Sequence, residues 1–390
     1  MKMKRLIITF FLIHAFAFCG FCQNNNYSFP TYKVGIFAPI YLDSAFSGND
    51  YRYTTQFPRF SFSGLEFIHG AQVALDSMLV YHANIEASFV DTKSNVFDSL
   101  IEAGKYNNFD LIIGSVKDKD FTQLTNLAFK RNIPFVSVTY PNDGGTTGNP
   151  FLIIMNSTLR AHCEGIFSYI LQTHIAENII LASQPGIQED KVRSYIHAAN
   201  TPDGSSLLNY KPLIIDDDYT VIKKYLDSTK LNIIIGGSLD PDFAAELTKQ
   251  LYAVKNTYNI KLIGMPNWEG FFKKANPKLK DFPVYFTSPF YVDPENLYLQ
   301  VLQGAYQQRY KINPSEIAMK GFEAVYMFVK LLATHPYDFI SQLNNPPHEV
   351  LAEYNFKPAF LSPASKMPDY FENKHLYILK VENGAIQLAN

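Results

Sequence analysis

From Lys33 onward, short apolar runs alternate with amphipathic stretches along the chain. In the first part, runs rich in β-branched residues predict strands at 34–38, 85–90, 111–113 and 135–138. Between these strands, apolar residues spaced three and four apart predict helices at 64–79, 96–105 and 121–130. This alternation is typical of a parallel sheet that is covered by helices on both faces.

A second series of the same kind begins after Pro150, with predicted strands at 151–155, 178–182, 213–215, 233–235 and 261–264 and a helix at 159–174. A strand at 284–287 and a helical region at 295–332 follow. The chain ends in a predicted hairpin at 376–388 that turns at Asn383-Gly384. We therefore expect an α/β protein with two doubly wound lobes. No low-complexity linker separates them, which favours several chain crossings between the lobes.

An internal repeat supports this division. Residues 109–115 and 231–238 both form an apolar strand that leads into a turn of Gly and Ser, and each is followed by an acidic helix start. Convergence on ordinary strand-turn-helix chemistry is the alternative explanation. In either case both turns follow the carboxyl ends of strands, where open α/β sheets bind ligands.

The N-terminus predicts export. Lys2, Lys4 and Arg5 precede a mostly apolar stretch at 6–18, and small residues at Gly20 and Cys22 favour cleavage before Gln23. A lipoprotein modified at Cys19 or Cys22 is the alternative, although a bulky Phe precedes each of these cysteines. We expect a protein in the periplasm that does not span the membrane after cleavage, because no later apolar run exceeds the length of a strand.

The charge and the cysteine content exclude two features, nucleic-acid binding and an internal disulfide. The net charge of the 390 residues is -2, and removal of three basic residues with 1–22 leaves 31 basic and 36 acidic residues, a net charge of -5. Nucleic acid is therefore an unsuitable partner. Only Cys163 remains in the cleaved chain, so we expect no internal disulfide.

Chemical motifs give no sign of an enzyme. The usual metalloprotease, hydrolase and phosphate-loop patterns are absent from the sequence. His162-Cys163-Glu164 resembles a metal-binding tripeptide. Adjacent helical residues point about 100° apart, however, so these three side chains cannot converge on one metal ion. Asp216-Asp217-Asp218 suits the start of a helix, and Gly144–Gly148 suits a surface loop. We expect no catalytic residue, metal or cofactor.

The order of several segments resembles the type I periplasmic-binding-protein family, which includes the leucine/isoleucine/valine-binding proteins of ABC transporters. These segments are VGIFAP at 34–39, GLEFIHGAQVALD at 64–76, DTK at 91–93, LIIG at 111–114, IPFVS at 133–137, TSPF at 287–290, and PSE at 314–316 leading to GFEA at 321–324. The resemblance implies two lobes joined by a hinge of three crossings. We place these crossings at 155–156, 285–288 and 333–335. The first lobe would then comprise 23–155 with 288–333, and the second 156–287 with 334–390.

The resemblance also implies a ligand site between the lobes. Amino-acid binders of this family hold the ligand carboxylate with Ser/Thr hydroxyls after the third and fourth strands. Here Ser115 is followed by Val116-Lys117-Asp118 instead of a Ser/Thr cluster, which puts an amino-acid ligand in doubt. From strand ends and neighbouring loops, the candidate ligand-binding residues are Ser115, Lys117, Thr139, Tyr140, Gly237, Ser238, Asp240, Trp268, Phe290 and Tyr291.

The sequence thus predicts an exported solute-binding protein that clamps a small polar ligand, amino-acid-like or another small metabolite. Its partners would be that ligand and a membrane permease or envelope protein. The alternative is a regulatory module of the cell envelope that kept the fold but lost small-ligand binding.

Overall fold

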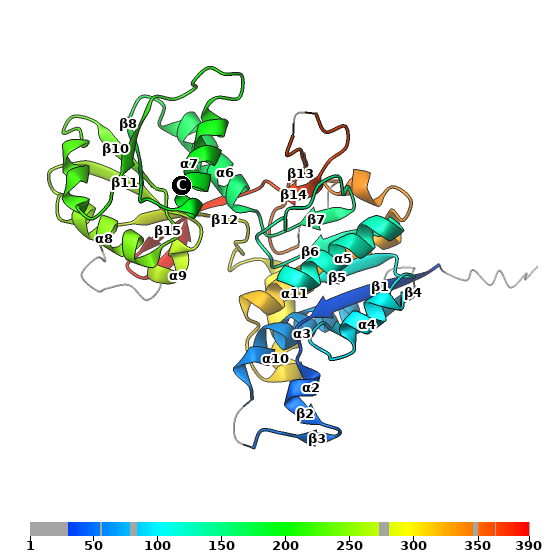
Figure 1. The fold of residues 1–390 in the computed structure, drawn as a ribbon. Coiled ribbons are helices and arrows are strands. Elements are labelled where there is room, and N and C mark those ends of the chain that lie inside the picture. The colour runs from blue at the N-terminus through cyan, green and yellow to red at the C-terminus, as the bar shows by residue number, and fades with distance from the viewer. Residues whose placement is uncertain are drawn as a thin grey trace, which may run out of the picture.

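A computed structural model describes residues 30–54, 57–78, 84–272, 281–345, 350–362 and 364–389. The predicted signal peptide, its cleavage site and the lipid-modification alternative lie outside the described residues. Within them the chain forms two α/β lobes, each built around a seven-stranded sheet (Figure 1). No helix in these ranges is long and apolar enough to cross a bilayer.

The first lobe has the strand order β13-β14-β7-β6-β5-β1-β4. All neighbouring strands except the β13–β14 pair are parallel. The strands are β1 (Thr31–Ala38), β4 (Asn84–Asp91), β5 (Leu111–Gly114), β6 (Phe135–Ser137), β7 (Leu152–Ile154), β13 (Phe356–Ala359) and β14 (Tyr370–Asn373). The helices are α2 (Leu42–Ala45), η1 (Arg59–Ser61), α3 (Phe62–Ser77), α4 (Phe97–Glu102), α5 (Asp118–Arg131), α10 (Leu297–Tyr310), α11 (Glu316–Thr334) and η4 (Phe339–Gln342). A small hairpin of β2 (Phe46–Ser47) and β3 (Asp50–Tyr51) follows α2.

The second lobe has the order β16-β15-β12-β11-β10-β8-β9, with five parallel strands and an antiparallel C-terminal hairpin. The strands are β8 (Asn178–Ser183), β9 (Tyr210–Ile214), β10 (Leu231–Gly236), β11 (Asn259–Ile263), β12 (Val284–Ser288), β15 (Tyr377–Glu382) and β16 (Ala385–Leu388). The helices are α6 (Leu159–Thr173), α7 (Ile187–Asn200), η2 (Tyr219–Lys224), α8 (Pro241–Tyr252) and α9 (Trp268–Phe272). The predicted turn is confirmed, since Asn383 and Gly384 have φ angles of 54° and 78°.

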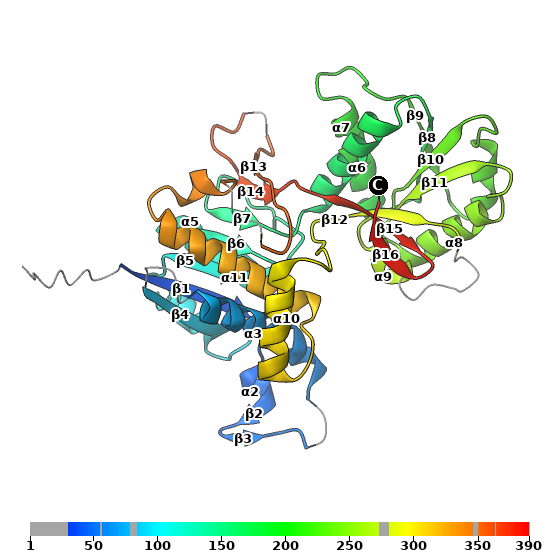
Figure 2. The same ribbon diagram turned by 180° about the vertical axis from the view of Figure 1, so that it is seen from behind.

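Alternation along the strands of the first lobe builds a core on each face of its sheet. Val34 and Ile36 of β1 pack with residues of α3 and α11, whereas Phe37 packs with residues of α4 and α5. The views in Figures 1 and 2 show these two helical layers on opposite faces of the sheet. The predicted sheet covered on both faces is therefore confirmed for this lobe.

The chain passes between the lobes in three places. It leaves β7 for α6 at 155–158 and leaves β12 for α10 at 289–296, so the predicted 285–288 forms a strand just before the second crossing. The third crossing lies at 374–376, between β14 and β15. Its predicted position at 333–335 is wrong, because the described elements between 334 and 373 belong to the first lobe. β13 and β14 extend the first sheet there, and their short, partly polar sequences gave no strand signal.

This connectivity shows which edge of each sheet lies beside the crossings. The first crossing starts at the carboxyl end of β7 and the second at the carboxyl end of β12. Parallel strands share one direction, so the carboxyl ends of β1, β4, β5 and β6 lie on the same edge as that of β7. The same holds for β8, β9, β10 and β11 in the second lobe. Both carboxyl edges therefore adjoin the crossings.

Candidate ligand-binding site

Two predicted hydroxyls come together at the carboxyl edge of the first lobe. Ser115 follows β5 and Thr139 follows β6, and their Oγ and Oγ1 atoms lie 3.0 Å apart. The backbone N–H of Ser115 donates to the carbonyl oxygen of Phe37 at 2.9 Å, which fixes the turn against β1. The side-chain amide of Asn156 donates to the Thr139 carbonyl oxygen at 2.7 Å and ties the pair to the first crossing. Each hydroxyl can donate one hydrogen and accept two, so the pair suits a carboxylate or another accepting group.

Lys117 and Tyr140 flank this pair. Lys117 is the N-cap residue of α5, and its exposed side chain leaves the ammonium in solvent. The Tyr140 hydroxyl donates to Asp118 Oδ1 at 3.3 Å, and its ring lies 5.1 Å from that of Phe121. Partial burial, followed by the Asp118 carboxylate, raises the pKa of Tyr140 above its ordinary value. Tyr140 thus stays neutral and half-buried, with its side chain packed against the start of α5.

In the second lobe, the predicted turn residues are held by internal bonds. Ser238 is fully buried, and its hydroxyl donates to Glu189 Oε1 at 2.6 Å. The N–H of Gly237 donates to the Ala182 carbonyl oxygen at 2.7 Å. Asp240 caps α8 by accepting the N–H of Asp242 at 2.7 Å, and this bond is the main reason its pKa is lowered. The hydrogen bonds of these three residues hold the strand, turn and helix of this lobe together. They agree with the alternative explanation of the internal repeat, which is convergence on ordinary strand-turn-helix chemistry.

Trp268 lies in the core of the second lobe. Its side chain is 0% exposed, and its Nε1–H donates to the Ser238 carbonyl oxygen at 2.8 Å. Two glycines make room for the indole, since a Cβ at Gly236 or Gly264 would come within 2.3 Å or 2.2 Å of the ring. In this arrangement the indole offers no surface to a ligand.

Phe290 and Tyr291 lie on the second crossing, and both are half-buried. The ammonium of Lys320 sits 5.2 Å from the Phe290 ring centre, a distance typical of a cation–π contact. The Tyr291 ring lies 5.7 Å from that of Tyr377, which begins β15 after the third crossing. The two aromatic residues therefore pack the hinge, and the structure does not bring them to the hydroxyl pair.

A guanidinium that the sequence did not single out stands at the carboxyl edge of the second lobe. Arg193 of α7 donates through Nη1 to Ser183 Oγ at 2.8 Å and to the Gln184 carbonyl oxygen at 3.0 Å, both at the end of β8. It also pairs with Asp190. No motif marks Arg193. Its one available signal was its place in the second turn of the helix that follows a predicted strand end.

Buried charges tie the first and third crossings together. Glu372 of β14 is 1% exposed and accepts the N–H of Thr158 at 2.6 Å. Lys374 stands between this carboxylate, at 2.8 Å, and Glu164 of α6, at 3.0 Å. Burial opposes the charge of Lys374, but the two carboxylates outweigh it and raise its pKa. The hinge therefore carries a bond network that links one lobe to the other.

The side chains of His162, Cys163 and Glu164 lie in different environments and do not converge. His162 Nδ1 lies 2.7 Å from Thr287 Oγ1, and burial lowers the pKa of this imidazole to about 3. Burial likewise raises the pKa of the Cys163 thiol to about 12. Glu164 bonds Lys374 instead. In the part of the chain that the structure describes, no group of three His, Cys, Asp or Glu residues could hold a metal ion.

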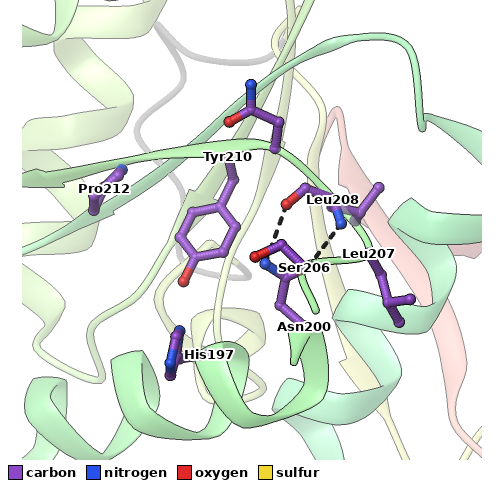
Figure 3. Close-up of a pocket in the computed structure, with 8 residues that line it drawn as sticks. His197, Asn200, Ser206, Leu207, Leu208, Tyr210 and Pro212 are labelled. Carbon is purple, nitrogen blue, oxygen red and sulfur yellow. Dashed lines mark hydrogen bonds between the residues drawn. The ribbon is translucent and has the colours of Figure 1, made fainter. Parts of the chain in front are cut away.

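A separate hollow of about 540 Å³ lies at the opposite, amino edge of the second sheet, between the end of α7 and the start of β9 (Figure 3). The Asn200 side chain closes one wall by bonding the Leu208 backbone. Its lining residues are His197, Asn200, Ser206, Leu207, Leu208, Asn209, Tyr210 and Pro212. It does not include any of the predicted site residues.

The fold of this chain is similar to that of several solved ABC transporter binding proteins. A branched-chain amino acid ABC transporter periplasmic ligand-binding protein from Burkholderia xenovorans is 12% identical, with a TM-score of 0.60 over 92% of this chain and 94% of its own. A substrate-binding protein from Desulfitobacterium hafniense in complex with Leu is 11% identical, with a TM-score of 0.56 over 92% and 100%. The Streptococcus pneumoniae protein LivJ in complex with isoleucine is 15% identical, with a TM-score of 0.51 over 92% and 99%. At these identities the likeness shows the fold.

No curated protein matches the sequence. A family model described as periplasmic binding protein matches residues 59–344, which is well over half of the chain. This match spans both lobes and the first two crossings. It agrees with the type I fold expected from the order of segments. The chain therefore belongs to the periplasmic binding protein family.

Proposed function

We propose that this protein is an exported solute-binding protein that closes its two lobes on a small polar ligand and performs no chemistry on it. The observation that carries the proposal is the paired hydroxyls of Ser115 and Thr139, at the carboxyl edge of a lobe that is hinged to a second one. Family membership supports a binding role and a location outside the cytoplasm. Delivery of the ligand to the permease of an ABC transporter is part of this proposal, and family membership supports it.

The ligand should carry at least one carboxylate or other strongly accepting group. One hydroxyl of the Ser115–Thr139 pair donates to the other, and the second O–H can donate to this group. The exposed ammonium of Lys117, two residues after Ser115, can add a charge-assisted bond. Tyr140 can cover an adjoining apolar portion. From the second lobe, we propose Arg193 and Gln184 as the groups that meet the ligand on closure, since Ser238 and Trp268 are buried. Branched-chain amino acids are the first ligands to test, because the similar structures carry them.

A thermal-shift screen of amino acids, small peptides, sugars and nucleosides tests this proposal. A ligand at 100 times its dissociation constant should stabilise the fold by about 2.7 kcal/mol. The shift should be lost in the double variant Ser115→Ala/Thr139→Val and kept in Ser99→Ala, which removes an exposed hydroxyl from α4. A shift that survives the double variant would refute the placement of the site.

A regulatory module of the envelope is the second candidate. The observation that favours it is that Ser238 and Asp240, the polar side chains of the turn after β10, both make internal hydrogen bonds. A broad screen without a hit would favour this function over solute binding.

A further inference from the structure

The segment from Tyr41 to Phe62, which we call the aromatic arm, carries a concentration of exposed apolar side chains. It joins β1 to α3 and contains α2, the β2–β3 hairpin and η1. Its described residues are 41–54 and 57–62. Seven large apolar side chains in these ranges are between 37% and 47% exposed: Leu42, Phe46, Tyr51, Tyr53, Phe57, Phe60 and Phe62. A soluble surface seldom gathers so many in one short stretch.

The base of the arm is held firmly. Asp91 at the end of β4 accepts the N–H groups of Ile40 and Tyr41 on Oδ1, at 2.9 and 3.0 Å, and that of Leu42 on Oδ2, at 2.7 Å. Asp43 accepts the N–H of Asn95 at 2.7 Å. These bonds keep Tyr41 in the left-handed region, with a φ of 63°, which is costly for a side chain with a Cβ. The arm therefore projects from the first lobe instead of collapsing onto it, as both views show (Figures 1 and 2).

The rings of the arm form a continuous row. Tyr41, Phe60, Tyr53, Tyr51 and Phe46 follow one another with centroid distances of 5.1, 6.2, 5.8 and 5.4 Å. Neighbouring rings are tilted by 55° to 65°. Sugars and nucleobases stack on flat, open ring faces, and a row of tilted rings offers no such platform. A partner that needs no fixed ring orientation fits this row better.

The charges of the arm balance. Asp43 and Asp50 stand against Arg52 and Arg59, so the segment is neutral within a chain whose cleaved form is acidic. Electrostatic interactions between exposed charges are largely screened beyond about 10 Å at 0.1 M salt. The neutral arm itself is therefore not repelled by an anionic membrane surface, although the rest of the chain is acidic. Tyrosine rings favour the boundary between lipid and water, because one end is apolar and the other is polar.

We propose that the aromatic arm is a membrane-contacting element that inserts its rings into the lipid–water interface. The arm leaves the carboxyl end of β1, so insertion would turn the edge that carries Ser115 and Thr139 toward the membrane. This orientation brings a bound ligand close to any membrane protein that receives it. The inference does not depend on which ligand is bound, or on whether one is.

Co-sedimentation with phosphatidylcholine vesicles, pure or mixed with phosphatidylglycerol, tests the inference on the full secreted chain without lipid modification. We expect binding to both compositions with little dependence on salt, because the interaction is apolar. Phe46→Ser/Tyr51→Ser should weaken it at least tenfold, by loss of two interfacial rings. The matched control is Ile175→Ser/Ile187→Ser, which removes two side chains of the second lobe that are 63% and 79% exposed, and it should bind like the parent.

Three outcomes would overturn the inference. One is absence of vesicle binding by the parent chain, and another is equal loss in both double variants. The third is self-association of the parent in sedimentation velocity that Phe46→Ser/Tyr51→Ser abolishes, because a second copy would then cover the arm. Unchanged melting temperatures would show that the variants fold, as expected for exposed positions.

Discussion

His162 is an ionisable side chain that the fold keeps neutral. It stands on the first turn of α6, where its Nδ1 meets Thr287 Oγ1 of β12 at 2.7 Å. Burial, with the charge of Lys374 as a smaller contribution, lowers its pKa to about 3. The residue therefore links α6 and β12, the elements beside the first two crossings, only in its uncharged form.

This neutrality predicts a pH dependence of stability. The unfolded chain protonates His162 near pH 6.5 and the folded chain near pH 3, so between these values the unfolded state binds the extra proton. The free energy of unfolding should fall by about 1.4 kcal/mol per pH unit as the pH drops through this window. Urea unfolding from pH 7 to pH 4 should give a shallower slope for His162→Asn than for the parent. Equal slopes would contradict the assignment.

At the residue scale, the sequence located only part of the candidate site. The pairing of Ser115 with Thr139 was accessible because both follow strands that were predicted correctly, and adjacent parallel strands place their ends together. The burial of Trp268 was not accessible, since it depends on the two glycines, Gly236 and Gly264, that make room for the ring. Arg193 was missed because its bonds to the end of β8 depend on the direction of a helix.

At the scale of elements, α3 and α11 approach each other through glycines. A Cβ at Gly321 of α11 would lie 2.3 Å from the Phe67 carbonyl oxygen of α3, and one at Gly70 of α3 would lie 1.9 Å from that of Ala318. The two helices pack backbone against backbone at these points. This contact fixes α3, whose N-terminal end receives the aromatic arm.

The close approach predicts opposite effects for two glycine substitutions. Gly321→Ala should lower the free energy of unfolding by about 1–3 kcal/mol, because the added methyl forces the helices apart. Gly304→Ala, on the exposed side of α10 with no atom within 4 Å of the new Cβ, should raise it by about 1 kcal/mol through helix propensity. Urea denaturation distinguishes the two. Similar changes in both variants would argue against the helix contact.

Most elements of both sheets were predictable because their apolar runs are long and regular. β13 and β14 were not, since Lys357, Pro358 and Glu372 interrupt their short runs. Pro358 lacks an N–H, and it is tolerated because β13 is the edge strand of its sheet. The error moved the third crossing by about forty residues. The predicted fold class was still correct, because the chain returns to the second lobe and ends there in the predicted hairpin.

At the scale of the whole molecule, bonds tie the lobes together near the crossings. Lys374 links a carboxylate of each lobe, and Ser157 Oγ donates to the Asn373 carbonyl oxygen at 2.7 Å. These bonds hold the first and third crossings side by side. Closure would then be a rotation of the lobes about an axis through these two crossings. This rotation brings the carboxyl edges of the two sheets toward each other.

Small-angle X-ray scattering, with and without a ligand from the thermal-shift screen, measures this closure directly. We predict a smaller radius of gyration at saturation, because the ligand binds both edges only when the lobes meet. Ser115→Ala/Thr139→Val should keep the radius of the free protein at the same ligand concentration. An unchanged radius for the saturated parent protein would contradict the account of this chain as a ligand-closed clamp.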